Sequence, residues 1–143
     1  MSVVPIQPYE INYPTIPSGS VFLFTTDSEI DYEVRFAKKK QNLLHCTIAF
    51  GVLNEEFDGE EYAMTNKGEA FRVMTTIVEI CNYYMEHHPF VNTYDFVGEP
   101  TADEDADFPT KRLRLYQRYL PRIFDDSWNI QVKGNKVLIS KLS

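Results

Sequence analysis

Strict alternation of apolar and polar residues between positions 30 and 36 constrains the fold more than any other feature. The apolar members are Ile30, Tyr32, Val34 and Phe36, and the polar members are Asp31, Glu33 and Arg35. This is the period of a β-strand with one face in water. An Asp27-Ser28-Glu29 turn joins it to residues 21–26, which predicts an antiparallel hairpin. The alternation resumes at about 43–53, so we expect a three-stranded meander.

Two later segments have the period of amphipathic helices. The first covers about 68–87 and ends before Pro89, and the second covers about 110–124, after Pro109. Pro121 falls inside the second pattern, which predicts a kink or an end near Tyr119–Leu120. The first helix has so wide an apolar face that we expect it to lie across the sheet. The residues expected in this core are Phe71, Ile77, Cys81 and Tyr84, against Tyr32, Val34, Ile48 and Phe50.

The rest of the pattern completes an α+β fold. A short buried strand is predicted at 94–97, and a hairpin at 128–133 and 136–141 around Gly134-Asn135. Its turn would place Ile130 opposite Ile139 and Val132 opposite Val137. The order β-β-β-α-β-α-β-β predicts an antiparallel sheet of five to six strands with two helices packed on one face. The 143 residues suffice for a single domain, which we place at 20–143.

Residues 1–19 are expected to form an extended arm. They hold four prolines, Pro5, Pro8, Pro14 and Pro17. Proline has no amide donor and favours extended backbone in the residue before it, so a helix is not expected there. Apolar residues lie between the prolines, which indicates that the arm lies on a surface, either of its own domain or of a partner.

Charge is unevenly distributed along the chain. Fourteen Lys and Arg against 21 Asp and Glu give a net charge of −7, which argues against general nucleic-acid binding. Residues 54–62 and 99–107 are acidic, whereas 111–122 are basic. Within the second helix Lys111, Arg114, Arg118 and Arg122 share one face, and Tyr119 lies beside it. This face is either a contact surface for phosphate or another anion, or a solvated face neutralised by residues 99–107; we favour the second interpretation.

No residue pattern identifies a reaction. His45-Cys46-Thr47 matches half of the paired His-x-Thr signature of two-histidine phosphoesterases, but no second His-x-Thr or His-x-Ser follows. Cys and His residues lack the close spacing of zinc ligands, and the acids at 103–107 lack the glycine and glutamate of a calcium loop. We therefore expect no catalytic residues, no metal and no cofactor.

The remaining features concern the compartment. Cys46 and Cys81 both lie in apolar runs, which favours free thiols in a reducing environment. Neither an apolar run long enough to span a membrane nor a signal peptide is found. We expect a cytoplasmic protein with no membrane partner.

Two short motifs resemble a group of small bacterial and bacteriophage α+β proteins. The first is the stretch Gly68-Glu-Ala-Phe-Arg-Val, a G-x-A-F-x-V helix start, and the second is Arg112-Leu-Arg-Leu-Tyr-Gln-Arg118, an R-x-x-L-Y-x-R pattern. The hairpin at the start of the domain resembles the same proteins. The group has no established activity, so the resemblance implies an outline of the fold and a mobile-element or phage-conflict context, and no catalytic residues.

The leading functional expectation is a non-enzymatic protein-binding module, such as an inhibitor, an immunity-type protein or an accessory protein. Its partner would be another protein or a second copy of the chain. The docking surface would be the sheet face away from the helices, with Asp31, Glu33, Arg35 and His45. One alternative is nucleic-acid or nucleotide binding through the basic helix at 110–124, and another is a small phosphoesterase centred on His45.

Overall fold

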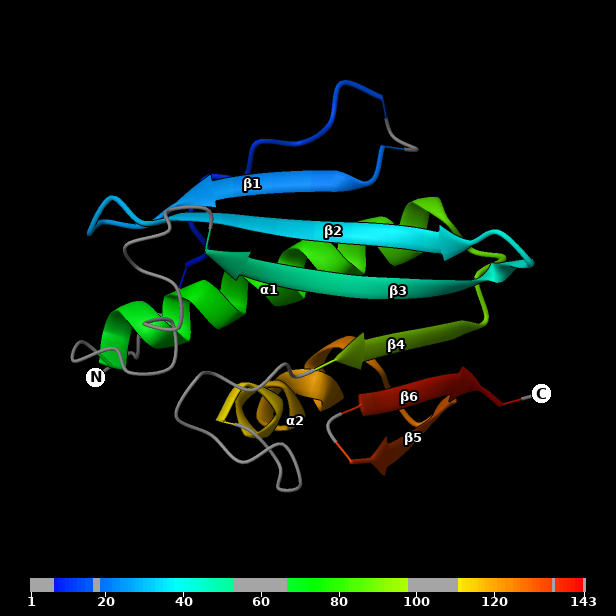
Figure 1. The fold of residues 1–143 in the computed structure, drawn as a ribbon. Coiled ribbons are helices and arrows are strands. Elements are labelled where there is room, and N and C mark those ends of the chain that lie inside the picture. The colour runs from blue at the N-terminus through cyan, green and yellow to red at the C-terminus, as the bar shows by residue number, and fades with distance from the viewer. Residues whose placement is uncertain (1–6, 17–18, 53–66, 98–110, 135, 143) are drawn as a thin grey trace.

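The computed structural model describes residues 7–16, 19–52, 67–97, 111–134 and 136–142 (Figure 1). The strands are β1 (Val21–Thr25), β2 (Asp31–Lys39), β3 (Asn42–Val52), β4 (Thr93–Val97), β5 (Trp128–Lys133) and β6 (Lys136–Lys141). The helices are α1 (Lys67–His87) and α2 (Lys111–Ile123). This is the predicted α+β fold with the predicted order of elements. In the described part of the chain, neither helix is long and apolar enough to cross a bilayer.

The six strands form one sheet in the order β1-β2-β3-β4-β6-β5. All neighbours pair antiparallel except β3 and β4, which run parallel with His45 opposite Thr93. The prediction of a wholly antiparallel sheet was therefore wrong at this pair. The reason is α1, which returns the chain to the end of the sheet where β3 began, so that β4 must run in the same direction.

Both helices pack on one face of the sheet, as predicted. Tyr84 of α1 stacks on Phe36 of β2 with ring centroids 3.9 Å apart, and Phe124, just after α2, lies 5.7 Å from Tyr94 of β4. Figure 1 shows α1 running behind β2 and β3, with α2 near β4. Apart from Asp95 of β4, the buried side chains of the strands that they cover belong to the alternating apolar positions. The opposite face carries the polar positions.

The predicted core of α1 is confirmed at three of its four residues. Ile77, Cys81 and Tyr84 are buried, but Phe71 is 38% exposed. Residues that face the sheet recur at positions 73, 74, 77, 80, 81 and 84, and Phe71 lies off this stripe. It therefore faces α2 instead of the sheet. The side chain of Phe50 lies outside the described residues.

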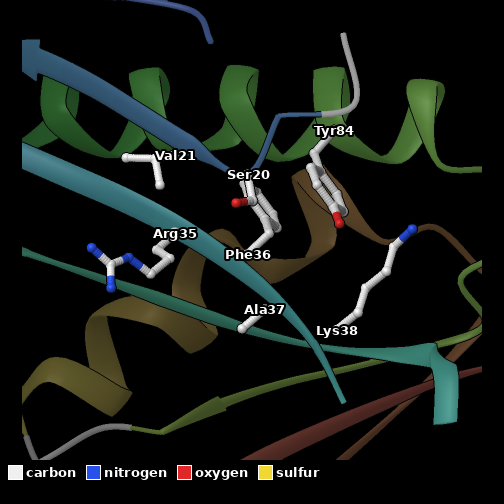
Figure 2. Close-up of a pocket in the computed structure, with 7 residues that line it drawn as sticks. All are labelled: Ser20, Val21, Arg35, Phe36, Ala37, Lys38 and Tyr84. Atoms are coloured by element: carbon white, nitrogen blue, oxygen red, sulfur yellow. The ribbon is translucent and has the colours of Figure 1, made fainter. Parts of the chain in front are cut away.

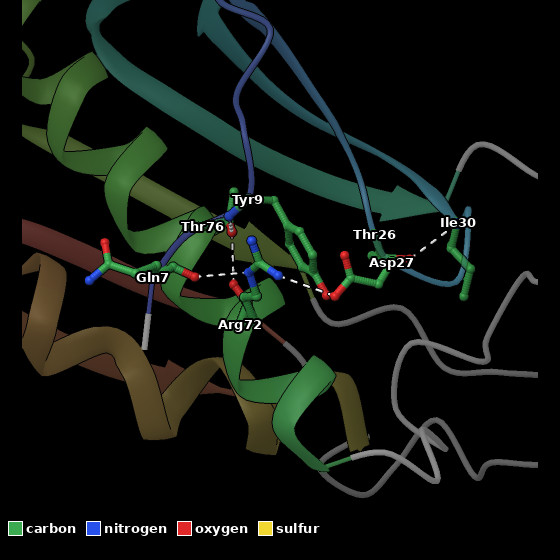
Figure 3. A network of polar contacts seen from close by, with 7 residues as sticks. All are labelled: Gln7, Tyr9, Thr26, Asp27, Ile30, Arg72 and Thr76. Atoms are coloured by element: carbon green, nitrogen blue, oxygen red, sulfur yellow. Dashed lines mark hydrogen bonds and ion pairs between the residues drawn. The ribbon is translucent and has the colours of Figure 1, made fainter. Parts of the chain in front are cut away.

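The described part of the arm packs on its own domain. Asn12 forms an antiparallel bridge with Leu23, and Tyr9 is only 4% exposed. Arg72 of α1 holds this segment, as Figure 3 shows: its Nε donates to the Gln7 carbonyl (3.0 Å) and its Nη1 donates to Asp27 (3.1 Å). The Tyr9 amide donates to the Thr76 hydroxyl, 2.8 Å away. Of the two surfaces considered for the arm, residues 7–16 thus occupy the one on their own domain.

The C-terminal elements follow the predicted pattern closely. In the β5–β6 hairpin Ile130 lies opposite Ile139 and Val132 opposite Val137. Gly134 in its turn has φ of 60°, a conformation that glycine adopts without strain. Helix α2 does not end near Tyr119–Leu120; it continues through Pro121 to Ile123, and the Phe124 amide donates to the Leu120 carbonyl at 2.9 Å. Proline is tolerated here because it removes only one helical hydrogen bond, close to the end of the helix.

Candidate functional site

The predicted site residues divide between the two sides of the sheet. Asp31, Glu33, Arg35 and His45 occupy positions on the face that the helices leave open. Arg118, Tyr119 and Arg122 lie on α2, on the other side. Lys111 and Arg114 also belong to α2, but their side chains lie outside the described residues. The structure therefore offers two candidate sites rather than one.

On the open face, the charged residues of β2 are ion-paired or hydrogen-bonded to their neighbours. The Arg35 guanidinium lies 2.8 Å from the Glu33 carboxylate, and the Thr25 hydroxyl donates to Asp31 at 2.7 Å. Exposed ion pairs of this kind contribute little to stability and leave little net charge to attract a ligand. This part of the face carries charges of both signs, so its electrostatic potential is not uniformly positive or negative.

The same face holds an ionic cluster that the sequence did not indicate. His45 Nε2 lies 2.5 Å from Asp95 Oδ2, and Lys39 Nζ lies 3.7 Å from the same oxygen. Asp95 is 1% exposed although it belongs to the polar side of β4. The sequence feature that could have pointed to this cluster was the acidic residue Asp95 in the middle of a strand predicted to be buried. A carboxylate bonded to one imidazole nitrogen fixes the ring's orientation, as it does in hydrolase triads.

The histidines do not converge as two-histidine phosphoesterase chemistry requires. The chain has three histidines. His88 is buried on the helix side, where its ring stacks on Tyr84 at 3.8 Å, and His87 Nδ1 lies 2.9 Å from the Tyr83 carbonyl oxygen. His45 faces the opposite side of the sheet. Base and acid cannot therefore act on one phosphate from these residues. Among the described residues, no three His, Cys, Asp or Glu side chains gather closely enough to hold a metal ion.

The second candidate site is a pocket between α1 and α2, which we call the interhelical pocket. It measures about 250 Å³ and is lined by Phe71, Arg118, Tyr119 and Arg122. Arg122 lies over the Tyr119 ring, with Cζ 5.0 Å from the centroid. Burial raises the pKa of Tyr119, against the opposing influence of Arg122 and Arg118, so its hydroxyl stays protonated at neutral pH. The pocket thus combines aromatic walls with two cations.

The charges in the interhelical pocket are uncompensated within the described part of the chain. Arg118 and Arg122 are exposed and form no ion pair with any described residue. The acidic segment 99–107, predicted to neutralise this helix, lies outside the described residues. Phe71 was predicted to lie in the core, so its place in the lining of this pocket was not expected. Its position off the sheet-facing stripe of α1 was the available signal.

A larger pocket of about 510 Å³ lies where β2 extends beyond the start of β1 (Figure 2). Its lining residues are Ser20, Val21, Arg35, Phe36, Ala37, Lys38 and Tyr84. Figure 2 shows the Lys38 amine and the Tyr84 hydroxyl at one end, with Arg35 pointing away from them. Because Arg35 pairs with Glu33, Lys38 is the one cation among the described lining residues that forms no ion pair with another described residue. This pocket is larger than the interhelical pocket but less strongly charged.

No family model, no curated protein and no solved structure matches this chain.

Proposed function

We propose that the chain is a non-enzymatic protein-binding module that takes an acidic segment of its partner in the interhelical pocket. The observation that supports this is the placement of two exposed guanidinium groups, Arg118 and Arg122, beside the exposed Phe71 in one hollow. Arginine bonds carboxylates through two parallel N–H donors, and arginine clusters are a common means of recognising acidic motifs. An apolar side chain of the partner would contact Phe71, with carboxylates on either side of it.

The size of the pocket favours a peptide side chain over a nucleotide. At about 250 Å³ it falls below the range of roughly 300–1,000 Å³ in which small-molecule sites normally lie. A single apolar side chain fits such a volume, whereas a base, a sugar and a phosphate together need more. The partner would therefore contribute one anchoring residue to the pocket and place its acids on the rim.

The charge of the chain also favours a protein over a nucleic acid. A polyanion must be neutralised at many phosphates, and the net charge of −7 repels it at long range. A short acidic segment needs only the local cations of α2. Nucleic-acid binding through α2 is the competing outcome, and the experiment below distinguishes the two.

The phosphoesterase alternative has less support. It requires a second histidine facing His45, and both other histidines lie at the end of α1. We place the proposed binding in an inhibitor, immunity-type or accessory role, within the mobile-element or phage-conflict context that the resemblance implies.

The experiment measures fluorescence anisotropy of a labelled Glu-Glu-Phe-Glu-Glu peptide titrated with the protein. We expect binding that weakens about tenfold or more in Arg118→Glu and in Arg122→Glu, because a charge-assisted hydrogen bond contributes roughly 1.5–3 kcal/mol. Lys38→Glu is the matched control, since it reverses one charge in the other pocket, and it should bind as the wild type does. A Gln-Gln-Phe-Gln-Gln peptide should bind more weakly.

Two results would contradict the proposal. Equal affinity for the Glu and Gln peptides would show that the arginines do not select carboxylates. Tighter binding of single-stranded oligothymidylate than of the Glu peptide at the same salt concentration would assign α2 to nucleic acid instead.

A further inference from the structure

The two edges of the sheet differ in how they are protected. Residues 7–16 pass along β1, where Asn12 and Leu23 bond each other's backbone at 2.7 and 3.2 Å. At the opposite edge lies β5, as Figure 1 shows, and no described segment pairs with its outer side. Its residues 129–133 are all exposed. An unpaired edge strand is a template for another strand.

The register of the hairpin determines which backbone groups of β5 point outward. The Leu142 amide donates to the Ser127 carbonyl at 2.8 Å, whereas the Lys141 amide donates away from β5, to the Asn92 carbonyl at 2.8 Å. Bonded and non-bonded pairs alternate in an antiparallel ladder, so Ile130 and Val132 direct their N–H and C=O groups away from β6. No described residue bonds these outward groups. The backbone N–H and C=O groups of Ile130 and Val132 are therefore available to bond another strand.

The side chains of β5 lack the features that normally block edge pairing. Positions 128–132 are Trp-Asn-Ile-Gln-Val, without charge or proline, and the β5–β6 register is free of bulges. Ile130 is 37% exposed and Val132 45% exposed, both on the helix side of the sheet. Because both are apolar and share one face, a partner strand that aligns with them would cover them together.

The charges at the two ends of β5 favour an antiparallel copy of the same strand. Exposed Asp125 and Asp126 precede the strand, exposed Lys133 is its last residue, and exposed Lys136 begins β6 just after the turn. In an antiparallel pair about a twofold axis, the acidic end of one strand meets the basic end of the other. A parallel pair would bring like charges together. The edge is thus complementary to itself, as an isologous interface must be.

We propose that two copies of this chain associate through antiparallel pairing of β5 with β5. The twofold axis passes beside Gln131, so that Ile130 faces Val132 of the second copy and Asn129 faces Lys133 of the second copy. A register centred on Ile130 would need the Trp128 amide, which already donates to the Asp125 carbonyl at 3.1 Å. A shift of the β5–β5 pairing register by one residue would place the apolar side chains of the two copies on opposite faces of the joined sheet. The two sheets join into one, and the twofold axis closes the assembly at two copies.

This dimer is independent of the interhelical pocket. A single pair of strands makes a small interface, so the dissociation constant should be on the order of 1–100 μM. Sedimentation velocity between about 1 and 200 μM should show a reversible monomer–dimer equilibrium. Ile130→Lys should be monomeric throughout, since a lysine would be placed opposite an apolar residue at each of two symmetric positions. Val132→Lys repeats the test in case the first variant is unstable.

Leu23→Lys is the matched control. Leu23 is 36% exposed and also lies on an edge strand, but residues 7–16 cover that edge. It should dimerise as the wild type does. A wild type that stays monomeric at the highest concentration would overturn the proposal, and so would a dimer that persists in both lysine variants. Assemblies larger than two copies would contradict the closed twofold arrangement.

A charge-exchange pair tests the orientation. Asp126→Lys cancels the charge of the acidic end of the strand, because Asp125 remains beside the new lysine, and Lys133→Glu cancels the charge of the basic end, because Lys136 remains. Only a mixed pair retains one intact acidic end that meets one intact basic end. Each variant alone should dimerise about tenfold more weakly than the wild type, whereas their equimolar mixture should form a heterodimer. Failure of the mixture to associate more strongly than either variant would rule out the antiparallel arrangement.

Discussion

At the scale of single residues, the notable feature is a carboxylate buried on the face of the sheet that the helices leave open. Asp95 retains its place there because His45 and Lys39 both approach the same oxygen, at 2.5 and 3.7 Å. A buried charge is tolerated only when it is paired and hydrogen-bonded. The pairing of Asp95 with His45 and Lys39 is therefore sufficient to explain why this carboxylate is buried.

Cys46 of β3 shows a second effect of burial, on the face of the sheet opposite to His45 and Asp95. Its thiol donates to the Tyr84 hydroxyl oxygen at 3.8 Å and is fully buried. Burial raises its pKa to about 11, while the Tyr84 hydrogen bond and Lys38 lower it. At pH 8 only about one thiol in a thousand is then a thiolate, which is the reactive form.

We therefore predict that Cys46 in the native protein reacts with iodoacetamide very slowly at pH 8, and that the rate rises as the pH approaches 11. Labelling followed by mass spectrometry measures this. Cys81 is also buried, and burial raises its pKa too, so unfolding in urea should make both thiols reactive. A Lys40→Cys variant, with an exposed thiol in the β2–β3 turn, should label fast without urea. Fast native labelling of Cys46 would contradict the burial of β3.

At the scale of elements, the N-terminal segment is part of the core. Tyr9 stacks on Phe24 of β1 with ring centroids 6.0 Å apart, and the Arg72 guanidinium lies over its ring at 4.0 Å. The sequence left open whether the arm lies on its own domain or on a partner. The contacts of residues 7–16 with α1 and β1 indicate that removal of this segment would expose part of the core.

Tyr9→Ala should lower the free energy of unfolding by about 3–5 kcal/mol, the range for truncating a buried aromatic residue. Urea denaturation followed by far-ultraviolet circular dichroism measures the change. The control is Ile16→Ala, because Ile16 belongs to the same segment but is exposed, and it should change stability by less than about 0.5 kcal/mol. If Tyr9→Ala and Ile16→Ala have the same stability, the packing of the arm on the domain is wrong.

At the scale of the whole molecule, the sheet is asymmetric. Strands β2, β3, β4 and β6 have neighbours on both sides, β1 is bridged by the arm, and β5 has a neighbour on one side only among the described residues. Backbone hydrogen bonds in the centre of a packed sheet open only when much of the protein unfolds, whereas those at an edge open locally.

Hydrogen exchange followed by mass spectrometry should reflect this asymmetry. In dilute solution, peptides from β3 and β4 should exchange slowest and peptides covering 128–133 fastest among the strands. If β5 pairs with a second copy, exchange in 128–133 should slow as the protein concentration rises, because the Ile130 and Val132 amides become bonded. The Ile130→Lys variant should lose this concentration dependence. Slow exchange of β5 in dilute protein would be inconsistent with an open edge.

The sequence by itself determined the elements and their local pairing. Alternating residues and turn chemistry predicted the hairpins of β1 with β2 and of β5 with β6, because both strands of a hairpin are neighbours in the chain. For β5 with β6 they also predicted the observed register. The apolar period of α1 likewise predicted that it covers the sheet. These contacts depend on short loops, whose geometry a few residues specify.

Only the tertiary structure decided which distant side chains meet. The parallel pairing of β3 and β4 brings His45 to Asp95 across 50 residues, and the rotation of α1 brings Arg72 to Gln7 across 65. The same rotation removes Phe71 from the sheet and places it beside Arg118. A periodic pattern shows that a helix has an apolar face, but the rotation and register of that face are set by packing of the whole core. The candidate site depends on that packing, and the sequence could name its cations but not the hollow that they share.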